Sequence, residues 1–272
     1  MTTKTLLALA ILLLVAYPSI AQNFPKDTLR YEIIYDYSYQ VNKEDTLSKQ
    51  KEQMVLKIAK NFSFYASLNN FKLMDLDKNW KESDGLPDRK SLPKTRVDYT
   101  ITKEYNSNKL TFTDWIKGDT YYFNQMLDKI EWKLIEDQKE VLGYVCKKAT
   151  TQFAGRSYVA WYTTEISIAD GPYKFQGLPG LILSIYDTNK HYQFIVSSIT
   201  NNTSVCNTAD IAKRPIFLTK EEYKILKKKY REKPSSIVSS GGMAFPKEFN
   251  DLADQRAKEK MKFENNPMEL ID

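Results

Sequence analysis

The amino-acid sequence predicts a mainly β (α+β) protein, built on an antiparallel sheet and ending in helices at its C-terminal side. From residue 29 to about residue 199, the strand-forming residues Tyr, Phe, Ile, Val and Thr recur in period-two stretches. After residue 199 the hydrophobic period changes to that of helices. The connections between the predicted strands are short, which favours an antiparallel meander over a parallel βαβ arrangement.

The first predicted strand places five large side chains on one face: Tyr31, Ile33, Tyr35, Tyr37 and Tyr39. Strands over residues 54–59 and 62–65 flank the two-residue break Lys60-Asn61, which predicts a hairpin. The charged stretch 76–95 contains Gly and Pro and is predicted to be an exposed loop. Further strands are predicted over residues 97–103, 109–116, 120–123, 132–136, 144–153 and 158–163.

Two helices are predicted near the C-terminal end. Thr219 and Glu222 have the spacing of a capping box, and Pro234 ends the helix that they begin. Residues 235–242 are rich in Ser and Gly and are interpreted as a linker. A second helix over residues 246–263 carries only a thin apolar stripe, so we expect it to pack loosely on the body of the protein.

Residues 1–21 have the pattern of a secretory signal peptide. Lys4 supplies the positive charge, an apolar run that is too short to span a bilayer comfortably follows, and the small residues Ser19 and Ala21 precede the expected cleavage site. The alternative is a buried N-terminal helix. We therefore expect a signal peptide over 1–21, an antiparallel β domain over 22–218, and a helical tail over 219–272 that packs on the same domain.

The signal peptide indicates an exported protein, periplasmic or secreted. No later segment approaches the apolar length of a membrane helix, so we expect a protein that is soluble after signal cleavage and not an integral membrane protein. In an oxidising compartment we expect the two cysteines, Cys146 and Cys206, to form a disulfide, since neither has another partner to choose. The alternative is two buried thiols that never meet.

The composition is poor in catalytic groups. The chain of 272 residues contains a single histidine, His191, and two cysteines, which excludes a His-rich metal centre and obliges any His-based triad to use His191. We predict no metal and no cofactor. The net charge of +6 is mild, and the basic stretch 220–233 is interpreted as a solvated helix face, so no nucleic-acid partner is expected.

The most unusual stretch of the chain lies between residues 171 and 182. Pro179 and Gly180 suit the two central positions of a type II turn that leads into a strand over 181–186, which pairs with a strand over 191–199. The glycines could form a rigid rim for a ligand, but turn chemistry and tight packing of the loop explain them without one. The residues that mark this stretch are Gly171, Pro172, Gly177, Pro179 and Gly180.

The hexapeptide at residues 177–182, Gly-Leu-Pro-Gly-Leu-Ile, resembles the signature of the GLPGLI family of exported bacterial proteins. Stretches at residues 143–149, 155–156, 160–166, 171–175 and 266–270 agree with that resemblance. The family is largely of unknown function, and it is similar to the bowl-shaped N-terminal domain of a bacterial peptide-N-glycosidase, in which the bowl is not the catalytic domain. The resemblance therefore implies a curved antiparallel sheet, a bowl or half-barrel, with a concave face.

The aromatic content suggests what such a concave face could hold. A tyrosine offers a flat apolar ring with a polar tip, so the tyrosines of the first strand could line a ligand-binding surface rather than a dry core. The expectation is a non-enzymatic binding or accessory protein of the bacterial envelope, whose partner is an envelope protein, a peptide, a glycan or a lipid. The candidate ligand-binding residues are Tyr31, Tyr35, Tyr37, Trp161, Tyr162, Tyr173 and Phe175.

Two other functions stay open at this point. A glycosidase needs only two carboxyl groups, so the acidic residues Glu165, Asp170 and Asp187 around the glycine-rich stretch are compatible with a carboxylate-based hydrolase. A structural component of an envelope complex is the third hypothesis. The sequence favours a protein that is not an enzyme without deciding the question.

Overall fold

The computed structural model describes residues 25–79, 88, 91–207, 215–242 and 245–270. The predicted signal peptide, residues 1–21, lies outside the described residues. Within those ranges, no helix has both the length and the apolar character that crossing a membrane requires.

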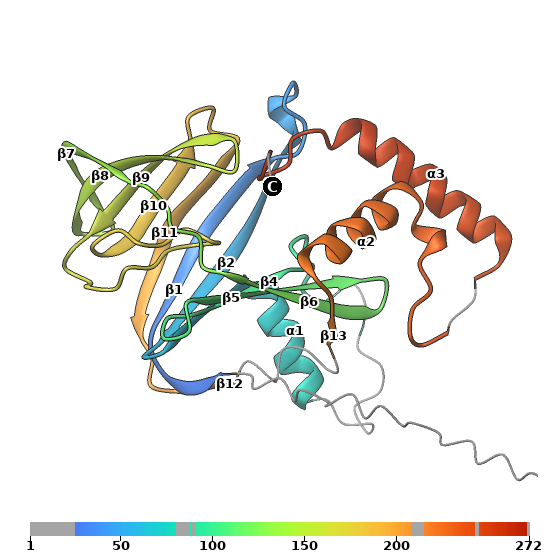
Figure 1. The fold of residues 1–272 in the computed structure, drawn as a ribbon, viewed down its shortest axis with the longest axis horizontal. Coiled ribbons are helices and arrows are strands. Elements are labelled where there is room, and N and C mark those ends of the chain that lie inside the picture. The colour runs from blue at the N-terminus through green and yellow to red at the C-terminus, as the bar shows by residue number, and fades with distance from the viewer. Residues whose placement is uncertain (1–24, 80–87, 89–90, 208–214, 243–244, 271–272) are drawn as a thin grey trace, which may run out of the picture.

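The described residues form one open, curved sheet of thirteen strands (Figure 1). Its order is β13-β6-β5-β4-β3-β2-β1-β11-β10-β9-β8-β7, with β12 beside the start of β1. All pairs are antiparallel except β13 with β6. The strands are β1 (Lys26–Gln40), β2 (Lys49–Ala59), β3 (Phe62–Ser67), β4 (Thr100–Glu104), β5 (Lys109–Ile116), β6 (Asp119–Met126), β7 (Lys133–Val141), β8 (Tyr144–Phe153), β9 (Arg156–Thr163), β10 (Leu181–Asp187), β11 (Tyr192–Asn201), β12 (Val205–Asn207) and β13 (Ile216–Phe217).

The predicted fold class is confirmed, and so is every predicted strand. The hairpin across Lys60-Asn61 joins β2 to β3. The curvature has a local cause, because the pairing registers slip at Ile34/Tyr35 on β1 and at Ile182/Ser184 on β10. Such irregularities bend a strand and increase its twist.

Three helices accompany the sheet in the described part of the chain: α1 (Leu68–Asn79), α2 (Lys220–Glu232) and α3 (Lys247–Phe263). Short 3-10 turns occur at Thr46–Ser48 (η1) and Pro234–Ser236 (η4). The predicted capping box begins α2, since the Thr219 hydroxyl accepts from the backbone of Glu222 and the Glu222 carboxylate accepts from that of Thr219. Neither α2 nor α3 contains a buried residue.

Helix α1 corrects the sequence analysis, which missed it and placed an exposed loop from residue 76. Its apolar residues do not gather on one face, so the segment shows no helical period. Phe71 nevertheless packs edge-on against Phe64 of β3, at 5.5 Å between ring centroids. Residues 80–87 and 89–90 of the predicted loop lie outside the described residues.

The predicted disulfide is wrong, because the structure contains no bond between Cys146 and Cys206. Cys146 lies on β8 in the main core, whereas Cys206 lies on β12 in a second cluster at the start of β1. In the sheet order β9, β10 and β11 stand between β8 and β1. Neighbouring strands are about 4.8 Å apart, so this separation exceeds the roughly 7 Å between Cα atoms that a disulfide can bridge.

Candidate ligand-binding pocket

Residues 164–180, between β9 and β10, form the glycine-rich segment, which is fixed on the sheet by a buried ion pair. Lys103 of β4 and Asp170 of this segment are both inaccessible to solvent, and the Lys103 ammonium contacts the Asp170 carboxylate. Lys103 also donates to the carbonyl oxygen of Gly171 at 2.8 Å, and the Tyr105 hydroxyl donates to Asp170 at 2.7 Å. Burial lowers the pKa of Lys103 against the opposing effect of Asp170.

The turn at Pro179 and Gly180 is tighter than the predicted type II turn. The Gly180 amide donates to Leu178 at 2.7 Å, a γ-turn, whereas the amide of Leu181 donates to Ile166 instead. Gly180 has a φ of +150°, and a Cβ there would lie 2.0 Å from the carbonyl oxygen of Thr163. Backbone packing against the end of β9 therefore requires this glycine, which supports the packing interpretation over a ligand rim.

Residues 265–270 form what we call the C-terminal strap, which returns from α3 to the sheet (Figure 1). The buried Arg156 guanidinium donates to three oxygens of the strap: the carbonyl of Met268 (3.0 Å), the carbonyl of Pro267 (2.6 Å) and the Asn266 side chain (2.6 Å). It also pairs with Asp187 at 3.3 Å. The strap is therefore anchored by a charged group that is almost wholly buried.

The strap in turn positions the glycine-rich segment. The Glu269 carboxylate accepts from the Tyr173 hydroxyl at 2.6 Å and pairs with the Lys174 ammonium at 2.7 Å. Tyr173 is left in an αL conformation with φ of 55°. Burial, and then the Glu269 charge, raises the pKa of Tyr173 well above its ordinary value.

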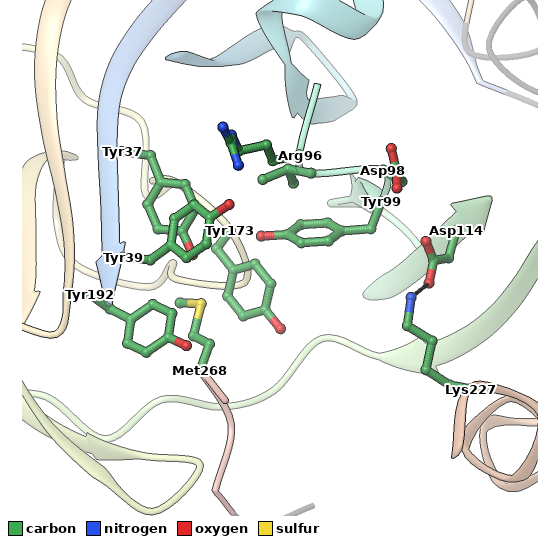
Figure 2. Close-up of a pocket in the computed structure, with 11 residues that line it drawn as sticks. Tyr37, Tyr39, Arg96, Asp98, Tyr99, Asp114, Tyr173, Tyr192, Lys227 and Met268 are labelled. Carbon is green, nitrogen blue, oxygen red and sulfur yellow. Dashed lines mark hydrogen bonds and ion pairs between the residues drawn. The ribbon is translucent and has the colours of Figure 1, made fainter. Parts of the chain in front are cut away.

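A cavity of about 250 Å³ lies beside the strap and opens to solvent. Figure 2 shows aromatic rings from several distant segments gathered around it. Its lining residues are Tyr37, Tyr39, Arg96, Val97, Asp98, Tyr99, Asp114, Tyr173, Tyr192, Lys227 and Met268.

The tyrosine rings of the pocket stack on one another. Tyr37 packs in parallel on Tyr39 at 4.8 Å between ring centroids, and on Phe194 of β11 at 4.4 Å. Tyr99 meets Tyr173 edge-on at 5.7 Å. Such contacts hold each ring in place before any ligand arrives.

The five tyrosine hydroxyls of the pocket fall into two groups. Those of Tyr173 and Tyr192 donate to the strap, to Glu269 and to the Asn266 carbonyl. Those of Tyr37, Tyr39 and Tyr99 have no hydrogen-bond partner among the described residues, and none of them is sealed from solvent. Burial raises the pKa of Tyr39 to about 12, and it raises the pKa values of Tyr37 and Tyr99 well above their ordinary value, so all three stay protonated donors.

Charged side chains form another part of the pocket lining, beside the tyrosines. The buried Asp114 carboxylate contacts the Lys227 ammonium and accepts from the Tyr223 hydroxyl at 2.7 Å, which ties α2 to β5. Arg96 and Asp98 are exposed, and neither side chain has an ion-pair partner in the described ranges. Partial desolvation, and then the Asp114 charge, raises the pKa of Asp98.

Of the residues proposed from the sequence to bind a ligand, Tyr37 and Tyr173 line this pocket. Tyr35 and Phe175 are wholly buried, and the Tyr35 hydroxyl donates to the Ile182 carbonyl at 2.7 Å. The other three are placed elsewhere in or against the core: Tyr31, Trp161 and Tyr162. Their ligand-binding role stays a prediction, but the pocket does not include them.

Sequence reasoning missed most of the pocket. Tyr39 could have been predicted, since it continues the alternating face of Tyr35 and Tyr37, but it is absent from the candidate ligand-binding residues. Tyr99 and Tyr192 lie on separate segments that only the sheet brings together. Met268 belongs to the strap, whose contact with the pocket depends on Arg156, more than one hundred residues earlier.

The acidic residues named from the sequence do not gather at one place. Asp170 pairs with Lys103, Asp187 pairs with Arg156, and Glu165 accepts from the Val145 amide at 3.0 Å. The ring of His191 lies 3.5 Å from Arg156. Among the described residues, no group of three or more His, Cys, Asp or Glu side chains is placed to hold a metal ion.

The chain is similar to parts of known proteins. Residues 98–224 match the family model of the N-glycanase peptide N-terminal domain. Two solved structures of PNGF-II, in space groups P21 and C2, superpose with TM-scores of 0.55 and 0.54 at 15% and 16% identity. No curated protein matches.

Both superpositions cover 75% of this chain but only 34% and 33% of the PNGF-II chains, so the protein spans about a third of their length. At such low identity the likeness extends to the fold alone. The resemblance to the GLPGLI family remains an expectation from the sequence. What the comparisons support is a chain that resembles the N-terminal domain of PNGF-II, a curved sheet with accompanying helices.

Proposed function

We propose that this protein is an exported, non-enzymatic binding protein of the bacterial envelope that holds a saccharide of a glycan in the tyrosine pocket. The observation that carries the proposal is the pairing of stacked tyrosine rings with three hydroxyls, those of Tyr37, Tyr39 and Tyr99, that have no partner in the described structure. A sugar ring presents a C–H face that packs on aromatic rings, and it carries hydroxyls that accept hydrogen bonds. It can therefore contact both the tyrosine rings and the tyrosine hydroxyls of the pocket.

The other ligand classes fit this pocket less well. A lipid carrier needs a deep, dry apolar cavity, whereas this one is open and carries Arg96, Asp98, Asp114 and Lys227 in its lining. The similarity of residues 98–224 to a domain of an N-glycanase points in the same direction, towards glycans. Export rests on the pattern of residues 1–21 and on the GLPGLI resemblance.

A carboxylate-based hydrolase is the second candidate, and one observation favours it. Asp98 and Asp114 both line the pocket, and the pKa of Asp98 is raised, as a general acid requires. Against this, the Asp114 carboxylate is engaged by Lys227 and Tyr223. A nucleophile or base would have to give up those contacts, so we favour binding.

Binding can be measured by calorimetry with N,N′-diacetylchitobiose and mannose oligosaccharides as probes. Tyr39→Phe and Tyr99→Phe each remove one unpartnered hydroxyl and keep the ring. Each should weaken binding about three- to tenfold, the equivalent of roughly 0.5–1.5 kcal/mol per hydrogen bond. Tyr31→Phe is the control matched to Tyr39→Phe, because Tyr31 lies on the same strand, β1, outside the pocket.

No heat of binding with any of these probes, or equal losses in the control and pocket variants, would contradict the proposal. The same mixtures should be assayed for released sugars. Turnover by the wild-type protein that disappears in Asp98→Asn would establish the hydrolase instead.

A further inference from the structure

Met268 is an apolar side chain on the pocket wall that comes from the C-terminal strap rather than from the sheet. In Figure 2 it lies beside Tyr192 and points toward the rings of Tyr37 and Tyr39, on the side of the pocket away from Arg96 and Asp98. Thioether groups make favourable contacts with aromatic rings and adapt to irregular gaps. The position of Met268 thus determines how far the cavity extends between the sheet and the strap.

The strap holds Met268 from both sides. On the preceding side, Asn266 donates to the Gln40 carbonyl at 2.7 Å and accepts from Arg156 at 2.6 Å. On the following side, Glu269 pairs with Lys174, and the Leu270 amide donates to Ala154 at 2.9 Å. Because the carbonyl of Met268 itself accepts from Arg156, the residue is fixed at its own backbone as well. This end of the pocket is therefore a wall and not a mobile lid.

The volume of the pocket limits what it can enclose. The cavity of about 250 Å³ is open to solvent on one side and is bounded by Met268 on another. One sugar ring is of the same order of size, whereas a second linked ring needs additional space. Any further sugar must therefore leave through the solvent-open side or displace Met268.

We propose that Met268 is a specificity-determining residue that closes one end of the pocket, so that the site binds the terminal sugar of a glycan chain rather than an internal segment. This inference rests on the proposed glycan-binding function. Arg156 acts as a positioning residue, since it holds the Met268 backbone without lining the pocket.

The test uses the series of β-1,4-linked N-acetylglucosamine oligomers from one to four units. The wild-type protein should bind all four with dissociation constants within about threefold, because only one sugar is enclosed. Met268→Ala removes the wall, and the dimer should then bind at least tenfold more tightly than the monomer. Met126→Ala is the matched control, since Met126 is 64% exposed and does not line the pocket.

Selective ¹³C labelling of the methionine methyl groups gives a second readout. The resonance absent from Met268→Ala should move on addition of the monomer, while that of Met126 should stay in place. Arg156→Lys keeps the charge, but a single ammonium cannot replace the guanidinium donors that contact three strap oxygens. This variant should shift the Met268 resonance, and its dependence of affinity on oligomer length should approach that of Met268→Ala.

Each outcome decides the matter. Wild-type affinity that rises more than about threefold with chain length, or the same length profile in Met268→Ala and the wild type, would overturn the inference while glycan binding itself stands. Absence of binding to every N-acetylglucosamine oligomer and to the mannose oligosaccharides, with no movement of the Met268 resonance, would overturn the function and this inference together.

Discussion

Two neighbouring regions of the molecule use the same kinds of residue in opposite ways. Around the strap, polar groups are satisfied: Arg156 has four oxygen partners, and the hydroxyls of Tyr192 and Tyr173 both donate to the strap. Across the pocket, the hydroxyls of Tyr39 and Tyr99 have no described partner. Most buried polar groups that maintain a fold are hydrogen-bonded, and our proposal is that a ligand completes this open set.

The largest effect should come from breaking the strap region at Arg156. Arg156→Met removes the cation and leaves Asp187, which is 1% exposed, without its charge partner. Loss of one member of a buried pair costs about 3–5 kcal/mol of the free energy of unfolding. Urea unfolding of the variant should show this loss. Arg96→Ala, on the pocket side, should stay within about 0.5 kcal/mol of the wild type, and equal effects at the two arginines would remove the contrast between the regions.

A loss of about 2–4 kcal/mol is expected for Gly180→Ala. The new Cβ would meet the Thr163 carbonyl oxygen at 2.0 Å, and the φ of +150° is one that alanine rarely adopts. Gly241→Ala is the control, because nothing lies within 4 Å of a Cβ there and no positive φ is involved. Thermal unfolding compares the two variants. An unchanged melting temperature for Gly180→Ala would show that the close approach at the end of β9 is not required.

A pair of hydroxyl deletions sharpens the comparison at a smaller scale. Tyr192→Phe leaves the Asn266 carbonyl of the strap without its donor and should cost about 1 kcal/mol of unfolding free energy. Tyr99→Phe removes a hydroxyl that has no described partner, so stability should be unchanged or slightly higher. Denaturant midpoints measured side by side decide this. A larger loss for Tyr99→Phe than for Tyr192→Phe would contradict the division into structural tyrosines and tyrosines with free hydroxyls at the pocket.

The last effect concerns pH and is absent at neutral pH. Burial raises the pKa of Tyr39 to about 12, so the folded protein keeps a proton that the unfolded chain begins to lose near pH 10. The contribution of Tyr39 is therefore complete below pH 10 and is lost as the pH rises toward 12. Ultraviolet difference titration should show a tyrosinate step near pH 12 that Tyr39→Phe removes. A step near pH 10 in its place would show that Tyr39 is solvated in the folded state.

The sequence was most informative where the signal is local. Strands with period-two alternation were located to within a few residues, and the capping box at Thr219 marked the start of α2. Helix α1 was not predicted, because its apolar residues do not form a stripe along one face of the helix. The disulfide was inferred from two cysteines and a compartment, and neither of these reports the distance between β8 and β12.

Residue pattern by itself determined that this chain forms strands, hairpins and two C-terminal helices, because backbone preference and hydrophobic period act over a few neighbouring residues. Only the tertiary structure decided which tyrosines become core and which face a cavity. That choice depends on the bend of the sheet and on Arg156 drawing the strap across it, contacts between residues more than one hundred positions apart. Such contacts leave no period in the sequence, so the pocket of Tyr39, Tyr99 and Met268 could be found only after the chain had been folded.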